Sequence, residues 1–295
     1  MQRKEFDTLT LLLEAKGNMT QREIAQRLGL SVGSVNKVCK DLSEQGFLQD
    51  GRITSAGVAA LEPYRVKRAV FLAAGFGSRL VPITFNTPKP LVRVNGTRMI
   101  DTLLDAVVAA GIPEIVIVRG YLGEQFDQLL YKYPQIKFVE NPIYNEANNI
   151  SSAMTVRYLL QNAYVLEADL ILHNPKLIRR YEYRSNFLGI PVDVTDDWCF
   201  HTDKNGVITA QDVGGTDCYQ MVGISYWDAA DGARLANDLN DVYTAPGGKE
   251  RYWEQTPMRY KKDNYQVEIR ECSAEDIIEI DTYNELKKVD KLYAL

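Results

Sequence analysis

The chain has 295 residues, of which 45% are hydrophobic, enough for two domains that each bury a core. The formal net charge of -5 argues against a protein devoted mainly to nucleic-acid binding, and it suits an enzyme that meets an anionic substrate at a local positive site. With no apolar run of about 18 residues and no charged-then-apolar leader, we expect a cytoplasmic protein without a membrane partner. The four cysteines are far apart and the two histidines form no cluster with them, which argues against structural zinc and disulfides.

Residues 1–63 form the first predicted domain. An apolar-periodic helix over 6–13 is followed by two further helices, and each of these opens on a capping signal. The first signal is Thr20 with Glu23 three residues later, a capping box, and the second is Ser31. The spacing is that of a helix-turn-helix.

A hairpin and a closing helix complete this first domain. Asp50-Gly51 lies between two short strand-like segments and predicts a hairpin, and residues 55–61 predict a last turn of helix. Over nearly its whole length the segment resembles the winged helix-turn-helix domains of bacterial regulators.

The charge of the first domain leaves its partner open. Residues 1–63 contain as many Lys and Arg as Asp and Glu, whereas a DNA-binding surface depends on neutralising phosphates. The second helix of the pair still presents polar residues outward, namely Ser34, Asn36, Lys37 and Lys40. Binding of double-stranded DNA is therefore one interpretation, and an association module that forms a homodimer is the other.

The second predicted domain spans 66–295, after a boundary at Pro63, because proline disfavours helix in the residue before it. Apolar strand-like runs alternate with helical patterns near 99–110, 123–131 and 149–161. The alternation predicts an α/β, Rossmann-like domain with a mostly parallel sheet and helices on both faces. The expected strands are Ala69–Ala73, Glu114–Val118, Lys137–Glu140 and Tyr164–Glu167.

Beyond about residue 185 the strands become shorter, with Gly and Asn-Gly turns, which indicates an antiparallel extension that covers the site. A final helix is expected over 281–291. Ligands of such sheets lie beyond the carboxyl ends of the strands. Asp169 follows the fourth strand and therefore lies at that edge.

A glycine loop follows the first strand of the second domain. Gly75 and Gly77 let the backbone approach an anion closely, and successive N–H groups in such a turn can hold phosphate oxygens. Arg79 and Lys89 add formal positive charge. The whole segment predicts a site for a triphosphate.

This segment resembles the signature of the nucleotidyltransferase family that joins NTPs to sugar phosphates and choline phosphate. The signature G-x-G-x-R-x-x-P-x-T, followed by P-K, is matched at every fixed position from Gly75 to Lys89. The resemblance implies that Arg79 and the loop backbone hold the β- and γ-phosphates and that Lys89 bridges the α-phosphate and the acceptor. It further implies Mg²⁺ between Asp169 and Asp281, although each aspartate taken alone reads equally well as a helix N-cap. The nucleotide contacts expected on this basis are Leu72, Ala73, Ala74, Gly75, Gly77, Ser78, Arg79, Gly120, Tyr121 and Asn149.

Within that family the second domain is most similar to the bacterial choline-phosphate cytidylyltransferases. A quaternary ammonium cannot donate a hydrogen bond, so its site must use aromatic faces and a carboxylate. The residues expected to contact the acceptor are Trp198, Tyr252, Trp253 and Glu254, although Trp253 could equally be a core aromatic residue. Glu254 stands where this branch is expected to have aspartate.

Several functions remain open at this stage. The first is Mg²⁺-dependent transfer of CMP from CTP to phosphocholine. Because the acceptor side departs from the branch, 2-aminoethylphosphonate, phosphoethanolamine and a sugar 1-phosphate are alternative acceptors. A different class is a DNA-binding regulator whose second domain senses a nucleotide or choline metabolite. Retention of both the metal aspartates and the bridging lysine favours the enzyme, since a sensor does not need them together.

Overall fold

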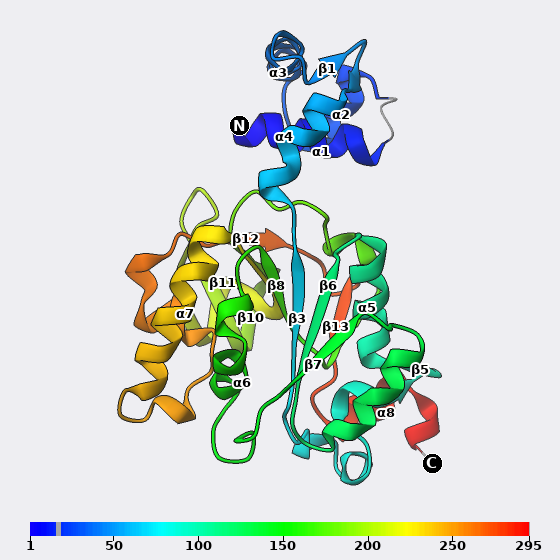
Figure 1. The fold of residues 1–295 in the computed structure, drawn as a ribbon, viewed down its shortest axis with the longest axis vertical. Coiled ribbons are helices and arrows are strands. Elements are labelled where there is room, and N and C mark those ends of the chain that lie inside the picture. The colour runs from blue at the N-terminus through cyan, green and yellow to red at the C-terminus, as the bar shows by residue number, and fades with distance from the viewer. Residues whose placement is uncertain (16–18, 295) are drawn as a thin grey trace. The chain divides into compact units, whose positions relative to one another are not determined.

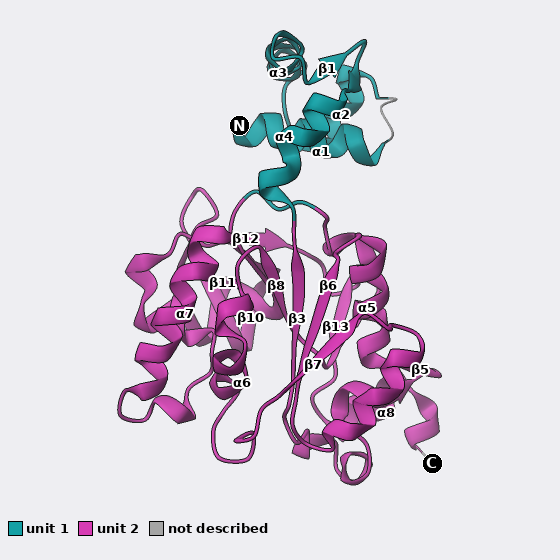
Figure 2. Cartoon of the chain, viewed as in Figure 1, with its two compact units in different colours: residues 1–65, 181–183 teal, residues 66–180, 184–295 magenta. Residues whose placement is uncertain are grey.

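The computed structural model describes residues 1–15 and 19–294 (Figure 1). Lys16, one of the cations counted for the first domain, and Leu295, the end of the predicted second domain, lie outside the described residues. The chain forms two compact units (Figure 2). Unit 1 is residues 1–65 with 181–183, and unit 2 is residues 66–180 with 184–295.

Unit 1 is built on three helices, α1 (Arg3–Glu14), α2 (Gln21–Leu28) and α3 (Val32–Glu44). The side chain of Thr20 accepts from the N–H of Glu23, whose carboxylate accepts in return from the N–H of Thr20 at 2.7 Å. Gly29 ends α2 with a φ of 63°, a left-handed conformation that costs glycine little. The side chain of Ser31 then caps α3. Both helices of the helix-turn-helix therefore begin at the capping residue expected from the sequence, α2 at Thr20 and α3 at Ser31.

The wing of unit 1 is the antiparallel pair β1 (Leu48–Gln49) and β2 (Arg52–Ile53), joined by Asp50 and Gly51, which both have positive φ. Helix α4 (Ser55–Leu61) and the 3₁₀ turn η1 (Glu62–Tyr64) follow. The core of the unit includes Leu9, Val35, Leu42 and Leu61, all fully buried. Tyr181, far away in the sequence, is 5% exposed and belongs to the same core.

Unit 2 is organised around a seven-stranded sheet (Figure 1). Its strand order is β12-β10-β11-β8-β3-β6-β7, and β11 is the strand that runs antiparallel to both of its neighbours. The other four pairings are parallel, so the predicted mostly parallel sheet is confirmed. The strands are β3 (Arg68–Ala73), β6 (Glu114–Arg119), β7 (Ile136–Glu140), β8 (Ala163–Glu167), β10 (Asn186–Thr202), β11 (Ile208–Trp227) and β12 (Glu268–Glu271).

Both faces of this sheet are covered. Along β3 the buried side chains alternate, with Phe71 in the core on one face and Val70 in the core on the other. Helix α5 (Met99–Ala109) packs into the first core, whereas α6 (Ile150–Thr155) and α7 (Ala229–Thr244) pack into the second. The interiors of the central strands β3, β6 and β8 are therefore apolar, which is why these strands were recognisable in the sequence.

Shorter elements complete unit 2. The strands β4 (Arg93–Val94) and β5 (Thr97–Arg98) pair with each other, as do β9 (Leu170–Leu172) and β13 (Ile277–Glu279), and α8 (Tyr283–Val289) is the last α-helix. The helix expected over 149–161 is divided, because Val156 leaves helical geometry and only the turn η6 (Arg157–Leu159) follows. The remaining short helices are η2 (Ser78–Leu80), η3 (Ile83–Phe85), η4 (Lys89–Leu91), η5 (Gly123–Tyr131), η7 (Pro175–Leu177), η8 (Gly248–Glu250), η9 (Thr256–Tyr260), η10 (Lys262–Asn264) and η11 (Lys291–Ala294).

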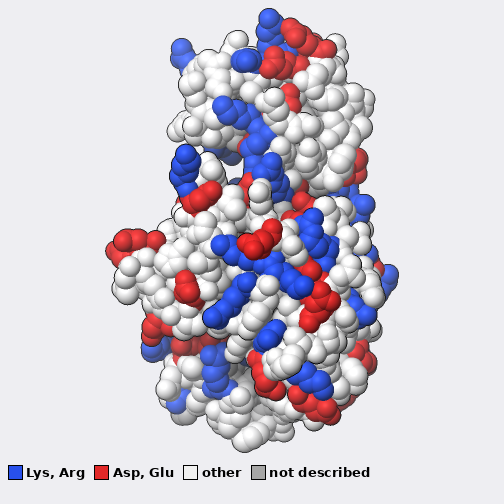
Figure 3. All heavy atoms as spheres, turned by 90° about the vertical axis from the view of Figure 1, so that its left-hand side faces the viewer, with Lys and Arg blue, Asp and Glu red and all other residues white. Residues whose placement is uncertain are grey.

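The surface carries both signs of charge. On the face seen in Figure 3, Lys and Arg side chains lie among those of Asp and Glu. Ion pairs on the surface of unit 2 include Arg234 with Asp231 at 2.9 Å and Lys261 with Asp241 at 2.8 Å. Among the described residues there is no helix whose length and apolar character would allow it to cross a membrane.

Candidate active site

A cavity of about 680 Å³ opens in unit 2 at the carboxyl ends of β3 and β8. This is the edge at which parallel α/β sheets bind their ligands. Most of the residues singled out from the sequence line it, including all of those expected in the glycine loop. These residues are Leu72, Ala73, Ala74, Gly75, Gly77, Ser78, Arg79, Lys89, Asn149, Asp169, Trp198, Tyr252, Glu254 and Asp281.

The glycine loop has a fixed shape. Gly77 has a φ of 61°, and a Cβ at this position would lie 2.8 Å from the Cβ of Lys89. The Thr84 hydroxyl donates to the carbonyl of Gly77 at 2.9 Å. The Tyr121 hydroxyl donates to the Thr84 carbonyl at 2.9 Å, and its N–H donates to the Ala74 carbonyl at 3.1 Å. The loop therefore keeps its backbone against Lys89 by contacts from within the signature and from Tyr121.

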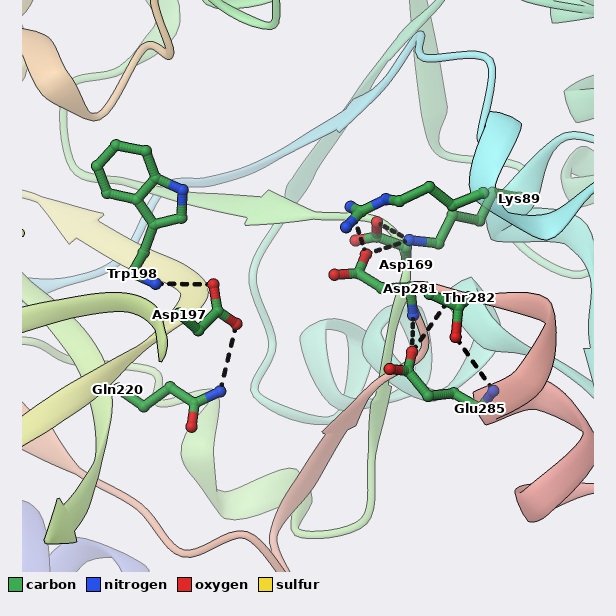
Figure 4. A network of polar contacts seen from close by, with 9 residues as sticks. Lys89, Asp169, Asp197, Trp198, Gln220, Asp281, Thr282 and Glu285 are labelled. Carbon is green, nitrogen blue, oxygen red and sulfur yellow. Dashed lines mark hydrogen bonds and ion pairs between the residues drawn. The ribbon is translucent and has the colours of Figure 1, made fainter. Parts of the chain in front are cut away.

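The Lys89 ammonium lies at the centre of the site. It donates to Asp169 at 2.6 Å and to Asp281 at 2.9 Å, and Arg79 donates to the same Asp281 oxygen at 2.7 Å (Figure 4). Lys89 is only 7% exposed. Burial by itself lowers the pKa of a lysine, but the two carboxylates outweigh it and leave the pKa of Lys89 raised. The ammonium therefore stays charged.

The pairing of β9 with β13 explains why Asp169 and Asp281 meet. Asp169 directly precedes β9, and in the register of this pair Leu170 faces Glu279. Asp281 follows β13, and its N–H donates to the Glu285 carboxylate of α8 at 2.7 Å. Neither aspartate is a helix N-cap, because a strand follows Asp169 and the cap of α8 is Thr282.

Two more acids surround this centre. Oxygens of Glu167, Asp169 and Glu279 lie within 4.8 Å of one another. Burial raises the pKa of Glu279 to about 8, with Asp169 and Asp281 adding to the rise. Burial, Asp169 and Glu279 also raise the pKa of Glu167 well above its usual range. Buried carboxylates this close together are stabilised when a cation binds between them.

The donor set fits a divalent metal. Oxygen ligands from one or two carboxylates are what Mg²⁺ takes in proteins. The Oδ1 atom of Asp169 is buried and has no hydrogen-bond partner among the described residues, so it can accept a further cation. The predicted pair Asp169 and Asp281 is therefore joined by Glu167 and Glu279, which the sequence interpretation missed. A signal was present, because each precedes its aspartate by two residues and alternate residues of an extended segment share a face.

Another part of the cavity lining carries aromatic rings and one buried acid. Trp198 and Tyr252 meet edge to face with ring centroids 5.8 Å apart. Glu254 is 2% exposed, and its Oε2 atom has no hydrogen-bond partner among the residues that the structure describes. Burial raises the pKa of Glu254 to about 7, although a hydrogen bond with the Asn149 side chain opposes the rise. The side chain of Asn149 also accepts from the N–H of Trp253 at 2.8 Å and so connects α6 to this wall.

Three predicted contacts lie away from the cavity wall. Trp253 is 3% exposed and packs on Phe187 and Trp227, so its assignment to the acceptor site is corrected to a core residue. Gly120 lies behind Tyr144, whose ring would be 2.7 Å from a Cβ at position 120. Tyr121 supports the glycine loop from outside, as described above. Neither Gly120 nor Tyr121 is among the residues that line the cavity.

Comparison with known proteins agrees with both units. Residues 68–193 match the family model described as "Nucleotidyl transferase", and residues 1–52 match that of the MarR family. The chain is 38% identical over 228 residues to the 2-aminoethylphosphonate cytidylyltransferase of Lancefieldella rimae, covering 76% of this chain and 92% of that protein. It is 31% identical over 229 residues to the choline-phosphate cytidylyltransferase of Streptococcus pneumoniae, covering 76% and 97%.

A solved structure shows the same fold. The CTP:phosphocholine cytidylyltransferase from Streptococcus pneumoniae matches with a TM-score of 0.71 and 30% identity, over 77% of this chain and 99% of that one. The chain therefore belongs to the nucleotidyltransferase family, whose members generally use a divalent metal. Within the family its relatives place it among the cytidylyltransferases, preceded by a winged helix of MarR type.

Proposed function

We propose that the protein transfers CMP from CTP to a phosphonate or phosphate oxygen of a small acceptor that carries a primary ammonium, such as 2-aminoethylphosphonate. The observation that carries this proposal is the arrangement of two unlike walls in one cavity. One wall is the glycine loop with Lys89 and Arg79, and the other contains Trp198, Tyr252 and the buried Glu254. The first suits phosphates and the second suits a cation.

The reaction needs positioning and neutralisation of charge. An acceptor oxygen attacks the α-phosphorus of CTP, a new P–O bond forms, and the bond to the bridging oxygen breaks as pyrophosphate leaves with that electron pair. Because both reactants are anions, Lys89 would lie between the α-phosphate and the acceptor, where a compact ammonium can follow oxygens that move. Arg79 and the loop N–H groups would hold the β- and γ-phosphates.

We assign the metal as Mg²⁺ held by Asp169 and Asp281, with the carboxylates of Glu167 and Glu279 close to that of Asp169. When bound, the ion supplies positive charge to the phosphate oxygens. Its binding is supported by the buried, unpartnered Oδ1 of Asp169 and by the carboxylate oxygens that converge there.

The acceptor wall favours a cation with N–H groups. The buried Oε2 of Glu254 is an acceptor without a donor among the described residues, and leaving it so costs free energy. A primary ammonium offers three donors, whereas a trimethylammonium offers none. The 38% identity to a 2-aminoethylphosphonate enzyme supports the same choice.

Phosphocholine is the second candidate acceptor. Trp198 and Tyr252 form an aromatic corner of the kind that attracts a quaternary ammonium through cation–π interactions. The similarity to choline-phosphate cytidylyltransferases supports this candidate as well.

A pyrophosphate-release assay with a panel of acceptors against CTP, UTP and ATP tests the proposal. We expect the highest kcat/KM with CTP and 2-aminoethylphosphonate, a lower value with phosphocholine, and no turnover without a divalent metal. A preference for phosphocholine would replace the primary ammonium with the second candidate, and turnover of a sugar 1-phosphate would contradict both. Tight CTP binding without turnover of any acceptor would support a sensor instead.

For unit 1 we propose binding of duplex DNA through α3. Asn36, Lys37 and Lys40 are exposed on this helix, as expected for a recognition helix that enters the major groove. The test is fluorescence anisotropy of the full chain on a library of genomic duplexes, at two salt concentrations. Lys37→Ala with Lys40→Ala should weaken binding and reduce its salt dependence, whereas Lys67→Ala in unit 2 is the control. Absence of binding to any duplex would leave association between copies as the role of unit 1.

A further inference from the structure

The Lys89 ammonium lies where a metal ion that bridges Asp169 and Asp281 would bind. Its Nζ atom is 2.6 Å from Asp169 and 2.9 Å from Asp281, the two carboxylates to which we assign the metal. A divalent ion that bound oxygens of both aspartates would need the space between them. In this structure the lysine ammonium occupies that space (Figure 4).

The Lys89 ammonium compensates the charge of the carboxylates around it. Oxygens of Glu167, Asp169 and Glu279 lie within 4.8 Å of one another, and the Lys89 ammonium joins Asp169 to Asp281. Removing the positive charge from such a group leaves like charges close together with nothing to compensate them. Lys89 is thus the counter-ion of the carboxylates as well as a candidate contact for phosphate.

We propose that Lys89 and the divalent metal compete for the Asp169–Asp281 pair, so that the lysine holds the empty site together and is released towards the phosphates only when the metal enters. The proposal rests on the metal assignment made above. In the free enzyme, Lys89 would then supply the positive charge that the metal supplies when it is bound.

The two aspartates are held in place, whereas the side chain of Lys89 is free to change its conformation. Asp169 and Asp281 are anchored, since the β9–β13 pairing fixes both segments and Glu285 holds the N–H of Asp281. The backbone of Lys89 is equally fixed in η4, but its four-carbon side chain can swing. The ammonium is therefore the part that moves. Arg79 has a side chain that is 65% exposed, and it can leave Asp281 in the same way.

Competition predicts an effect opposite to the one expected for catalysis. Lys89→Met should abolish most turnover, yet without nucleotide it should bind Mn²⁺ more tightly than the wild type. We expect a gain of about tenfold to a thousandfold, the range by which a neighbouring charge at this distance shifts the binding of a proton. The measurement is free Mn²⁺ by electron paramagnetic resonance, in the absence of CTP and acceptor. In the same samples Mn²⁺ should raise the Tm of the variant more than that of the wild type.

Lys137→Met is the matched control. Its ammonium also pairs with a carboxylate, that of Glu114 at 3.0 Å, but it is not among the residues of the cavity. This variant should bind Mn²⁺ like the wild type. Equal or weaker Mn²⁺ binding by a folded Lys89→Met protein would overturn the proposal.

A second measurement follows the Lys89 ammonium of the wild-type protein directly and uses a variant only to assign its signal. The Lys89 ammonium, held by two carboxylates, should give a slowly exchanging ¹⁵N–¹H signal, assigned by its loss in Lys89→Gln. Diamagnetic Mg²⁺ added without nucleotide should broaden or shift this signal at the concentration at which the site fills. An unchanged signal at saturating Mg²⁺ would contradict the exchange. Both experiments read metal binding in the free protein, so they can fail while the acceptor assay succeeds, and the reverse.

Discussion

At the residue scale, the cations of the glycine loop belong to one contiguous segment, whereas Glu254 and Trp253 are defined by their burial. The spacing from Gly75 to Lys89 is contiguous in the sequence, so the glycine loop and its cations could be found there. The raised pKa of Glu254 depends on burial between segments that are distant in the chain. The burial of Trp253 could not be predicted either, since nothing in its local sequence distinguishes a ring in the core from a ring that faces a ligand.

The first prediction concerns the pH dependence of stability. Glu254 has an ordinary carboxyl pKa of 4.5 in the unfolded chain and about 7 when folded. The folded state therefore binds this proton more tightly, and the stabilisation is complete below pH 4.5 and lost as the pH rises towards 7. At about 1.4 kcal/mol per pKa unit, the wild type should lose on the order of 3 kcal/mol of unfolding free energy across this window.

Urea denaturation at pH 4.5 and pH 8 checks this expectation. Glu254→Gln should reduce the difference between the two pH values by the contribution of Glu254, and the raised pKa values of Glu167 and Glu279 account for the pH dependence that remains. The exposed Glu124→Gln is the control and should retain the wild-type difference. The assignment fails if Glu254→Gln keeps the full pH dependence.

The second prediction separates backbone strain from contact with Lys89. Gly77→Ala should lose about 1 kcal/mol or more of stability because of its positive φ. It should also lower kcat severalfold, since the new Cβ would lie 2.8 Å from the Cβ of Lys89. Gly247→Ala has a similar φ of 69° but no atom within 4 Å of its new Cβ, so it should lose stability and keep its kcat. Equal kcat values for the two folded variants would exclude the contact as important.

At the element scale, the strands β3, β6, β7 and β8 were predicted within one residue, because their apolar runs are contiguous in the sequence. Beyond residue 185 the expectation of shorter strands was wrong, since β10 has 17 residues and β11 has 20. The pair β9 and β13 was not predicted. Each strand has three residues, and their pairing joins segments about a hundred residues apart. That pairing brings Glu279 next to the segment of Asp169. The spacing of Glu167 and Glu279 from their aspartates was visible in the sequence, but the pairing that brings the two segments together was not.

The third prediction concerns the capping box of α8. Thr282 and Glu285 cap this helix, and the Glu285 carboxylate also accepts from the N–H of Asp281. Glu285→Ala should cost about 1 kcal/mol of stability. It should also weaken Mn²⁺ binding, because Asp281 loses the contact that orients it.

A second capping box supplies the control. Glu23 closes the equivalent box at the start of α2 in unit 1, far in sequence from the cavity residues. Glu23→Ala should cost a similar amount of stability and leave both turnover and Mn²⁺ binding unchanged. If the two variants bind Mn²⁺ equally well, the link from α8 to the metal site does not hold.

At the scale of the whole molecule, the division into two parts was predicted from a change of pattern near Pro63. The structure divides the chain between residues 65 and 66, and unit 1 also takes Tyr181–Tyr183 from the middle of the sequence. Tyr183 lies 5.3 Å from Phe6 and 5.5 Å from Tyr64, measured between ring centroids. A contribution so distant in sequence leaves no local pattern, which explains why a linear division omitted it.

The last prediction follows from this arrangement. Deletion of residues 1–65 should leave kcat and both KM values within about twofold, since every cavity residue belongs to unit 2. Tyr181 and Tyr183 would lose the core in which they pack, so the truncated protein should expose apolar surface and aggregate at a lower concentration. Replacing both tyrosines by serine in the truncated chain should restore solubility without changing kcat, as measured by light scattering and the pyrophosphate assay. A truncated protein that is soluble but inactive would instead show that unit 1 supports catalysis.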